Sequence, residues 1–155
     1  MTRFLAKLID GILLGVVYGF LVVFLVLGLI FGAMAGGTGG GFIASAISTL
    51  ISTALVVGYF AFMESSRGQT VGKMLLKIEV RGPDGQHPTL EQAIKRNAYL
   101  AVGLVGIIPI LGTLLAPLLS LGATIAIAVT INSNTATRQG WHDVFADGTS
   151  VIKVG

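Results

Sequence analysis

The fold is decided by an uncharged stretch near the start of the chain, residues 11–63: GILLGVVYGFLVVFLVLGLIFGAMAGGTGGGFIASAISTLISTALVVGYFAFM. A bilayer favours such a segment, because one charge at mid-membrane costs roughly 3 kcal/mol. About 20 residues span the hydrocarbon, so this stretch is too long for a single crossing. The glycine-rich segment 36–41 divides it, since glycine favours a turn over a helix interior. We predict a membrane hairpin of two helices, residues 2–35 and 42–65.

The remaining charges are segregated in the same way. Charged side chains crowd residues 64–96, residues 97–137 have none, and the tail is charged again. Only 11% of the 155 residues are charged, whereas 54% are hydrophobic. A soluble domain is about a quarter charged, so this composition argues against an ordinary soluble enzyme and excludes a disordered chain.

The second uncharged block, residues 97–137, allows three or four membrane spans in total. Pro109, Gly112 and Pro117 lie near its middle, so it is either one kinked span or two short spans, residues 90–112 and 114–131. Lys and Arg stay on the cytoplasmic side, and four spans place all ten basic residues there, together with the N-terminus. We therefore prefer four spans, although three remain possible. The predicted fold is an all-α membrane protein, a small transmembrane helical bundle that forms one domain over residues 1–155 and lies in the cell (inner) membrane.

Two short segments between and after the spans predict a β-ribbon at the membrane interface. Residues 74–80 partly alternate between apolar and polar, and residues 149–154 form a second candidate strand that can pair with them. Thr89 and Gln92 have the spacing of a capping box, which predicts the start of the helix that leads into the third span.

Asp10 is the one acid placed near the hydrocarbon. It lies close to Lys7 on helical spacing, and on the same helix face as Arg3, two turns away. It is either an interfacial residue paired with Lys7 or an intramembrane carboxylate on an ion or proton path.

Gly11, Gly15 and Gly19 form a small-residue stripe on the first helix. Such stripes let helices approach closely, so we expect these glycines to pack against another helix. Packing within the chain is the preferred interpretation, and a face for a second copy or a partner membrane protein is the alternative.

The motifs of common enzymes and nucleic-acid binders are absent from the sequence. Residues 68–73, GQTVGK, resemble a phosphate loop but have the wrong spacing, and Met74 stands where the motif needs Ser or Thr. There is no cysteine, no HExxH and no GxSxG. Basic residues are too few and too dispersed for nucleic acid. We expect no enzyme activity, no metal and no cofactor, and the lipid bilayer as the main partner.

Three sequence blocks together resemble the RDD family of membrane proteins: RFLAKLID at 3–10, GQTVGKMLLKIEV at 68–80 and RQGWHDVFADGTSV at 138–151. The Arg and two Asp that give the family its name match Arg3, Asp10 and Asp143, with Asp84 as the other candidate for the second Asp. Arg96 also fits the family pattern. The resemblance implies an integral membrane protein for which transport of ions or small ligands is the usual suggestion, and some members are accessory parts of membrane complexes.

This resemblance leads to two hypotheses about function. The first is a transporter of ions or small ligands, including cation/proton exchange, with a polar network of Arg3, Asp10, Asp143, Arg96 and His142 at the cytoplasmic membrane edge. One arginine between two carboxylates would be either a structural clasp or a relay whose pairing alternates. The alternative is a non-catalytic scaffold or accessory subunit that docks partner helices, or a second copy, through its glycine-rich face.

Overall fold

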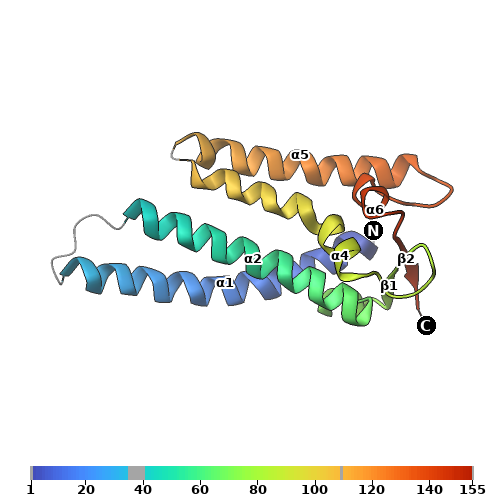
Figure 1. Cartoon of the computed structure of the whole chain (residues 1–155), viewed down its shortest axis with the longest axis horizontal. Helices are drawn as coiled ribbons and strands as arrows, with labels where there is room; N and C mark the ends of the chain where they lie inside the picture. The colour runs from blue at the N-terminus through green and yellow to red at the C-terminus, as the bar shows by residue number, and fades with distance from the viewer. Residues whose placement is uncertain (1, 35–40, 109, 155) are drawn as a thin grey trace.

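The computed structural model describes residues 2–34, 41–108 and 110–154. Most of them are helical, and two short strands form a small sheet. The elements in chain order are α1 (Thr2–Met34), α2 (Gly41–Arg67), α3 (Val71–Leu75), β1 (Ile78–Arg81), α4 (Leu90–Asn97), η1 (Ala98–Ile107), α5 (Leu111–Ser133), α6 (Trp141–Phe145) and β2 (Ser150–Lys153). Both chain termini and the sheet lie at one end of the molecule, which we call the sheet end (Figure 1).

The long helices run from the sheet end in two pairs. One pair is α1 and α2, and the other is η1, which continues from α4, and α5 (Figure 1). The pairs meet where α2 packs against α4 and η1, while α1 packs against α3. The bounds of α1 and α2 agree closely with the predicted helices 2–35 and 42–65, and the predicted turn between them falls mainly on residues 35–40, outside the described residues.

Two helices in the described part of the chain are long and apolar enough to cross a membrane. They are Ala46–Arg67 within α2 and Leu114–Ser133 within α5. Large apolar side chains cover their outer surfaces, and Phe62 and Leu118 are 68% and 63% exposed. An exterior of this kind suits contact with lipid rather than water, which agrees with the predicted membrane location.

The second helical pair differs in detail from the prediction. The expected helix 90–112 is α-helical only to Asn97 and then continues as the 3₁₀ helix η1 to Ile107, while the last helix begins at Leu111 rather than at residue 114. Gly103 and Gly106 lie within η1 and lower its preference for α geometry. Gly112 permits the early start of α5, because a Cβ there would collide with the carbonyl oxygen of Val105.

The predicted pairing of two strands is confirmed. Strands β1 and β2 are antiparallel, with Ile78 opposite Lys153 and Arg81 opposite Ser150. The expectation that the first strand begins at residue 74 is wrong, because Met74 belongs to α3 and Lys77 adopts a left-handed turn with φ of 54°. The segment before Met74 is bound to α1, as described below, and that attachment favours a helical turn there.

The predicted capping box is also confirmed and fixes the start of α4. The Thr89 hydroxyl accepts a hydrogen bond from the Gln92 amide at 3.2 Å, and the Gln92 side chain accepts one from the Thr89 amide at 2.9 Å. From this start, α4 places Arg96 and Asn97 on its buried face.

Candidate functional site

The carboxylate of Asp143 lies between two arginines from two other helices. Its Oδ2 accepts a hydrogen bond from Arg3 Nη1 at 3.2 Å, and its Oδ1 lies 3.0 Å from Arg96 Nη2. The backbone amide of Gly140 also donates to Oδ2, at 2.9 Å, because Asp143 caps the start of α6. Asp143 is fully buried, and the two positive charges offset the cost of burying its negative charge.

Glu64 extends this contact into a row of alternating charges. It forms an ion pair with Lys73, and its Oε2 lies 3.6 Å from Arg96 Nε and accepts a hydrogen bond from Asn97 Nδ2 at 3.0 Å. Burial lowers the pKa of Lys73, and the nearby carboxylate of Glu64 opposes that shift. We call the row the ion-pair chain; its members, from α3, α2, α4, α6 and α1, are Lys73, Glu64, Arg96, Asp143 and Arg3.

Asp10 does not join the ion-pair chain. Its carboxylate accepts hydrogen bonds from the Tyr59 hydroxyl at 2.9 Å, from the Thr70 hydroxyl and from the Gly72 amide at 2.7 Å. The expected arrangement, with Arg3 between Asp10 and Asp143, is therefore not formed: of these two acids Arg3 contacts Asp143 alone, and the arginine that lies between two carboxylates is Arg96. Asp10 is about 10 Å further along α1 than Arg3, which puts it beside α3 rather than beside α6.

The sequence motif at residues 68–73 thereby gains a structural role. It wraps around the end of the Asp10 side chain, and a Cβ at Gly72 would collide with the backbone carbonyl of Ala6 on α1. Only glycine allows α3 to approach α1 this closely. The segment that resembles a phosphate loop therefore holds a carboxylate of the same chain.

Lys7 is not paired with Asp10, contrary to one of the two interpretations of the sequence. Its ammonium lies over two aromatic rings, 4.7 Å from the centroid of Phe60 and 4.5 Å from that of Tyr99. No carboxylate among the described residues lies within 4.0 Å of its Nζ. Aromatic faces stabilise such a cation without neutralising it.

His142 is buried beside Asp143 in an aromatic cluster. Its ring meets Tyr99 and Trp141 edge to face, with centroids 5.9 Å and 6.3 Å away. Burial lowers the pKa of His142 to about 4, so the imidazole is neutral at physiological pH. Its Nε2 lies 3.5 Å from Asp143 Oδ1, and its buried Nδ1 has no hydrogen-bond partner within the described structure.

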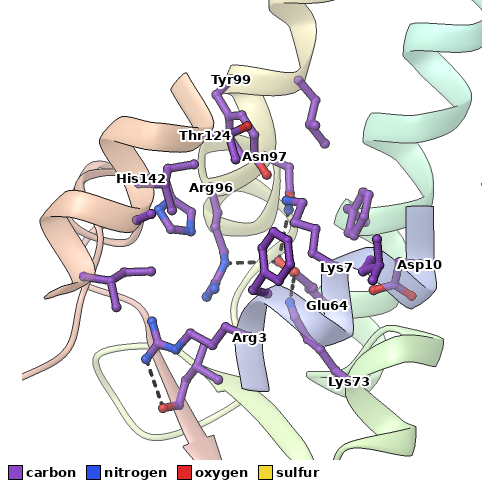
Figure 2. Close-up of a pocket in the computed structure, with 18 residues that line it drawn as sticks. Arg3, Lys7, Asp10, Glu64, Lys73, Arg96, Asn97, Tyr99, Thr124 and His142 are labelled. Atoms are coloured by element: carbon purple, nitrogen blue, oxygen red, sulfur yellow. Dashed lines mark hydrogen bonds and ion pairs between the residues drawn. The ribbon is translucent and has the colours of Figure 1, made fainter. Parts of the chain in front are cut away.

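A cavity of about 320 Å³ lies beside the ion-pair chain, with walls from α1 and α5. Figure 2 shows Arg96 in this cavity between His142 and Glu64, with Lys7 close by. The buried Nη1 of Arg96 has no hydrogen-bond partner in the described part of the chain. Six charged residues line the cavity: Arg3, Lys7, Asp10, Glu64, Lys73 and Arg96. No three acidic or histidine side chains among the described residues are grouped as metal ligands would be.

The predicted glycine stripe faces outward. A Cβ added to Gly11, Gly15 or Gly19 would meet no described atom of another element within 4 Å, and all three glycines are exposed. The preferred expectation of packing within the chain is therefore not met by the described residues, and the face is open to another molecule.

Several residues of the site were not anticipated from the sequence. Glu64 and Lys73 are two of many charges in residues 64–96, and no pattern in the sequence predicts that Tyr59 and Thr70 bind a carboxylate. Glu64 did carry a signal, because it is the first charge after a long apolar run and thus lies at the membrane edge. Asp84 lies in an exposed turn, where its Oδ1 accepts a hydrogen bond from the Gln86 amide at 3.0 Å, away from the ion-pair chain.

The comparisons with known proteins place these residues within one family domain. A family model described as the RDD family matches residues 1–147 and so covers the ion-pair chain, Asp10 and every residue that lines the cavity except Val151. No curated protein and no solved structure matches the chain.

Proposed function

This chain belongs to the RDD family, and on that premise we propose that it crosses the membrane four times and transports an ion or a small ligand by way of the cavity between α1 and α5. The observation that carries the proposal is a group of charged side chains around a cavity at the sheet end of an otherwise apolar helical bundle. Ionisable residues at membrane depth are costly, and they commonly mark the path of a substrate or an ion.

The arrangement of the helices supports four spans. Helices α1 and α2 leave and return to the sheet end, and so do η1 and α5 (Figure 1). Because 3₁₀ geometry rises by about 2.0 Å per residue, the ten uncharged residues of η1 reach about 20 Å. The third span is therefore shorter than a hydrocarbon core of about 30 Å, and a locally thinner bilayer accommodates it. Basic side chains gather at the sheet end, so that end faces the cytoplasm.

Single-cysteine labelling tests this topology, since the natural chain has no cysteine. The variants Gly85→Cys and Lys153→Cys should react with a membrane-impermeant maleimide from the same, cytoplasmic side. Gly39→Cys should react only from the opposite side. Labelling of residues 85 and 153 from opposite sides would leave an odd number of spans between them and refute the four-span arrangement.

The ion-pair chain suggests how a ligand moves. Arg96 contacts Glu64 and Asp143, two acids on different helices, so it can strengthen one contact as it weakens the other. A ligand that takes up one contact of Arg96 would favour one of these pairings. Two alternative pairings of one arginine are a simple basis for two states of the bundle.

Transport is tested with purified protein in liposomes that contain a pH-sensitive dye. Gradients of sodium, potassium, chloride and phosphate are applied in turn, and uptake is compared with protein-free liposomes. Lys7→Met removes the one cavity cation that has no carboxylate partner, so we expect flux to fall at least about tenfold while the protein stays folded. Lys153→Met, a matched change on the exposed strand β2, should leave flux unchanged. Flux equal to that of empty liposomes for every gradient would refute transport.

The open glycine stripe favours a second candidate function, that of an accessory subunit. Gly11, Gly15 and Gly19 offer a flat face that no described element covers, and small residues let another helix approach. Gly15→Leu should then reduce the mass of the complex recovered in mild detergent, measured by light scattering. Gly122→Leu, at an equally open glycine on α5, is the control. A monomeric mass for the unmodified protein, with no other chain recovered, would contradict this function.

A further inference from the structure

The two acids that line the cavity, Asp10 and Glu64, have both of their carboxylate oxygens engaged by protein groups. Both carboxylate oxygens of Asp10 accept hydrogen bonds from the protein. Glu64 Oε1 is paired with Lys73, and Oε2 accepts from Asn97. A bound cation needs carboxylate or carbonyl oxygens that are available for coordination. These acids therefore position protein groups, and they do not offer a cation site.

The cavity has basic groups that lack an acceptor. Arg96 is 4% exposed, and its buried Nη1 has no partner among the described residues. The ammonium of Lys7 contacts aromatic faces and no described carboxylate. Buried donors are normally hydrogen-bonded, so the buried Nη1 of Arg96 indicates a missing acceptor; the buried carboxylate oxygen without a hydrogen bond nearby, Asp143 Oδ1, lies 3.0 Å from Nη2 of the same guanidinium. Lys7 adds a positive charge without a described carboxylate partner to the same cavity. An anion would supply acceptor oxygens and negative charge to both groups.

Apart from the polar Asn97, Thr124 and His142, apolar side chains form most of the remaining cavity wall, and some of them reach the outer surface. They come from α1, η1 and α5, and they include Leu8, Leu100, Ile127 and Ile131. Phe4, which also lines the cavity, is 63% exposed, and Leu8 is 49% exposed. Side chains that line a cavity and reach the exterior mark its opening. The exposed Phe4 and Leu8 place this opening beside the first turns of α1.

We propose that the cavity binds an anionic amphiphile of the kind found in membranes, with its phosphate at Lys7 and Arg96 and its acyl chain along the apolar wall between α1 and α5. This inference rests on the proposed function and names the ligand class of the same cavity. The volume of about 320 Å³ lies in the range of ligand cavities and accommodates a headgroup phosphate with the first part of a chain. The charged end of the cavity lies at the sheet end, where lipid phosphates lie in a four-span arrangement.

Native mass spectrometry of the whole protein tests this inference. The protein is released from nanodiscs of equal parts phosphatidylcholine and phosphatidylglycerol, and the lipids that remain bound are identified. We expect retention of phosphatidylglycerol in preference to phosphatidylcholine. Lys7→Met should lower that retention about tenfold, since a hydrogen bond to a charged group is lost. Lys7→Arg should preserve it, and Lys153→Met should have no effect. Methionine still packs against Phe60 and Tyr99, so the Lys7→Met protein should remain folded.

A second arm separates a lipid from a soluble anion. The same protein is titrated with inorganic phosphate, and the fluorescence of Trp141, which adjoins His142, is recorded. Retention of phosphatidylglycerol without a phosphate response supports the amphiphile. A saturable phosphate response with no lipid preference would overturn it, as would equal retention of the two lipids. Ion flux without lipid preference overturns this inference alone, whereas lipid preference without any flux overturns only the transport function.

Discussion

Replacement of Asp143 by asparagine should destabilise the bundle more than any other single charge removal at the sheet end. Asp143 is fully buried, and Asp143→Asn leaves the guanidinium groups of Arg3 and Arg96 beside a neutral amide. Removal of one partner from a buried ion pair costs about 3–5 kcal/mol. After this change Arg96 keeps only its longer contact with Glu64, at 3.6 Å, and Arg3 has no carboxylate partner among the described residues. We therefore expect the free energy of unfolding to fall by about 3–5 kcal/mol.

The two arginines should contribute unequally to that loss. The side chain of Arg96 is 5% exposed, whereas that of Arg3 is 24% exposed and is better solvated. In double-mutant cycles with Arg3→Met and Arg96→Met, we expect a coupling energy of about 2–3 kcal/mol for Arg96 with Asp143. The coupling of Arg3 with Asp143 should be near 1 kcal/mol, roughly the value of a partly exposed ion pair.

The assay is unfolding by sodium dodecyl sulfate from mild-detergent micelles. The chain has a single tryptophan, Trp141, which begins α6 two positions before Asp143, so its fluorescence reports directly on that segment. Loss of less than about 1 kcal/mol in Asp143→Asn would show that Asp143 does not hold the bundle together. A coupling to Arg3 as large as that to Arg96 would refute the argument from burial.

Three further predictions concern the surroundings of this contact. Gly72→Ala should lower the free energy of unfolding by about 1–3 kcal/mol, because the added Cβ collides with the Ala6 carbonyl. A smaller change in the same unfolding assay would contradict the close approach of α3 to α1. Burial lowers the pKa of His142 from about 6.5 in the unfolded chain to about 4 in the folded protein. The contribution of His142 to stability should therefore be complete above about pH 6.5 and fall by about 3 kcal/mol as the pH drops to 4. His142→Gln should remove this part of the pH dependence, and an unchanged profile would exclude His142 as its source. Thr89→Ala should cost about 1 kcal/mol through loss of the α4 cap, whereas Thr135→Ala in the exposed turn after α5 should cost little.

The sequence allowed the helical hairpins and the contact between distant blocks to be predicted, because both follow from the separation of charge and apolar surface. A long uncharged run cannot remain in water, and a glycine-rich break fixes where it turns. Arg3 and Asp143 both match one family pattern, which predicted that these two residues from opposite ends of the chain lie close together. The structure shows them in contact. The paired strands followed from the same placement at one end.

The partners of each buried charge could not be predicted, because they depend on how helices rotate and slide against one another. Arg3 and Asp10 share a face of α1, but Arg3 contacts Asp143 of α6, whereas Asp10 is bound by Gly72 of α3. Helical periodicity gives no information about such neighbours. The 3₁₀ geometry of η1 could not be predicted either, because its sequence is almost entirely apolar. A run without polar positions has no hydrophobic periodicity that distinguishes one kind of helix from another.

The contact of Arg3 with Asp143 joins positions 140 residues apart, which has a consequence for biogenesis. Arg3 is synthesised long before Asp143, whereas Glu64 precedes both of its partners, Lys73 and Arg96, and can pair with each of them as soon as it is synthesised. The helices before α6 must therefore be made before α6 can dock. Formation of the contact between Arg3 and Asp143 at the sheet end is therefore a late step of folding, which follows the synthesis of every helix before α6.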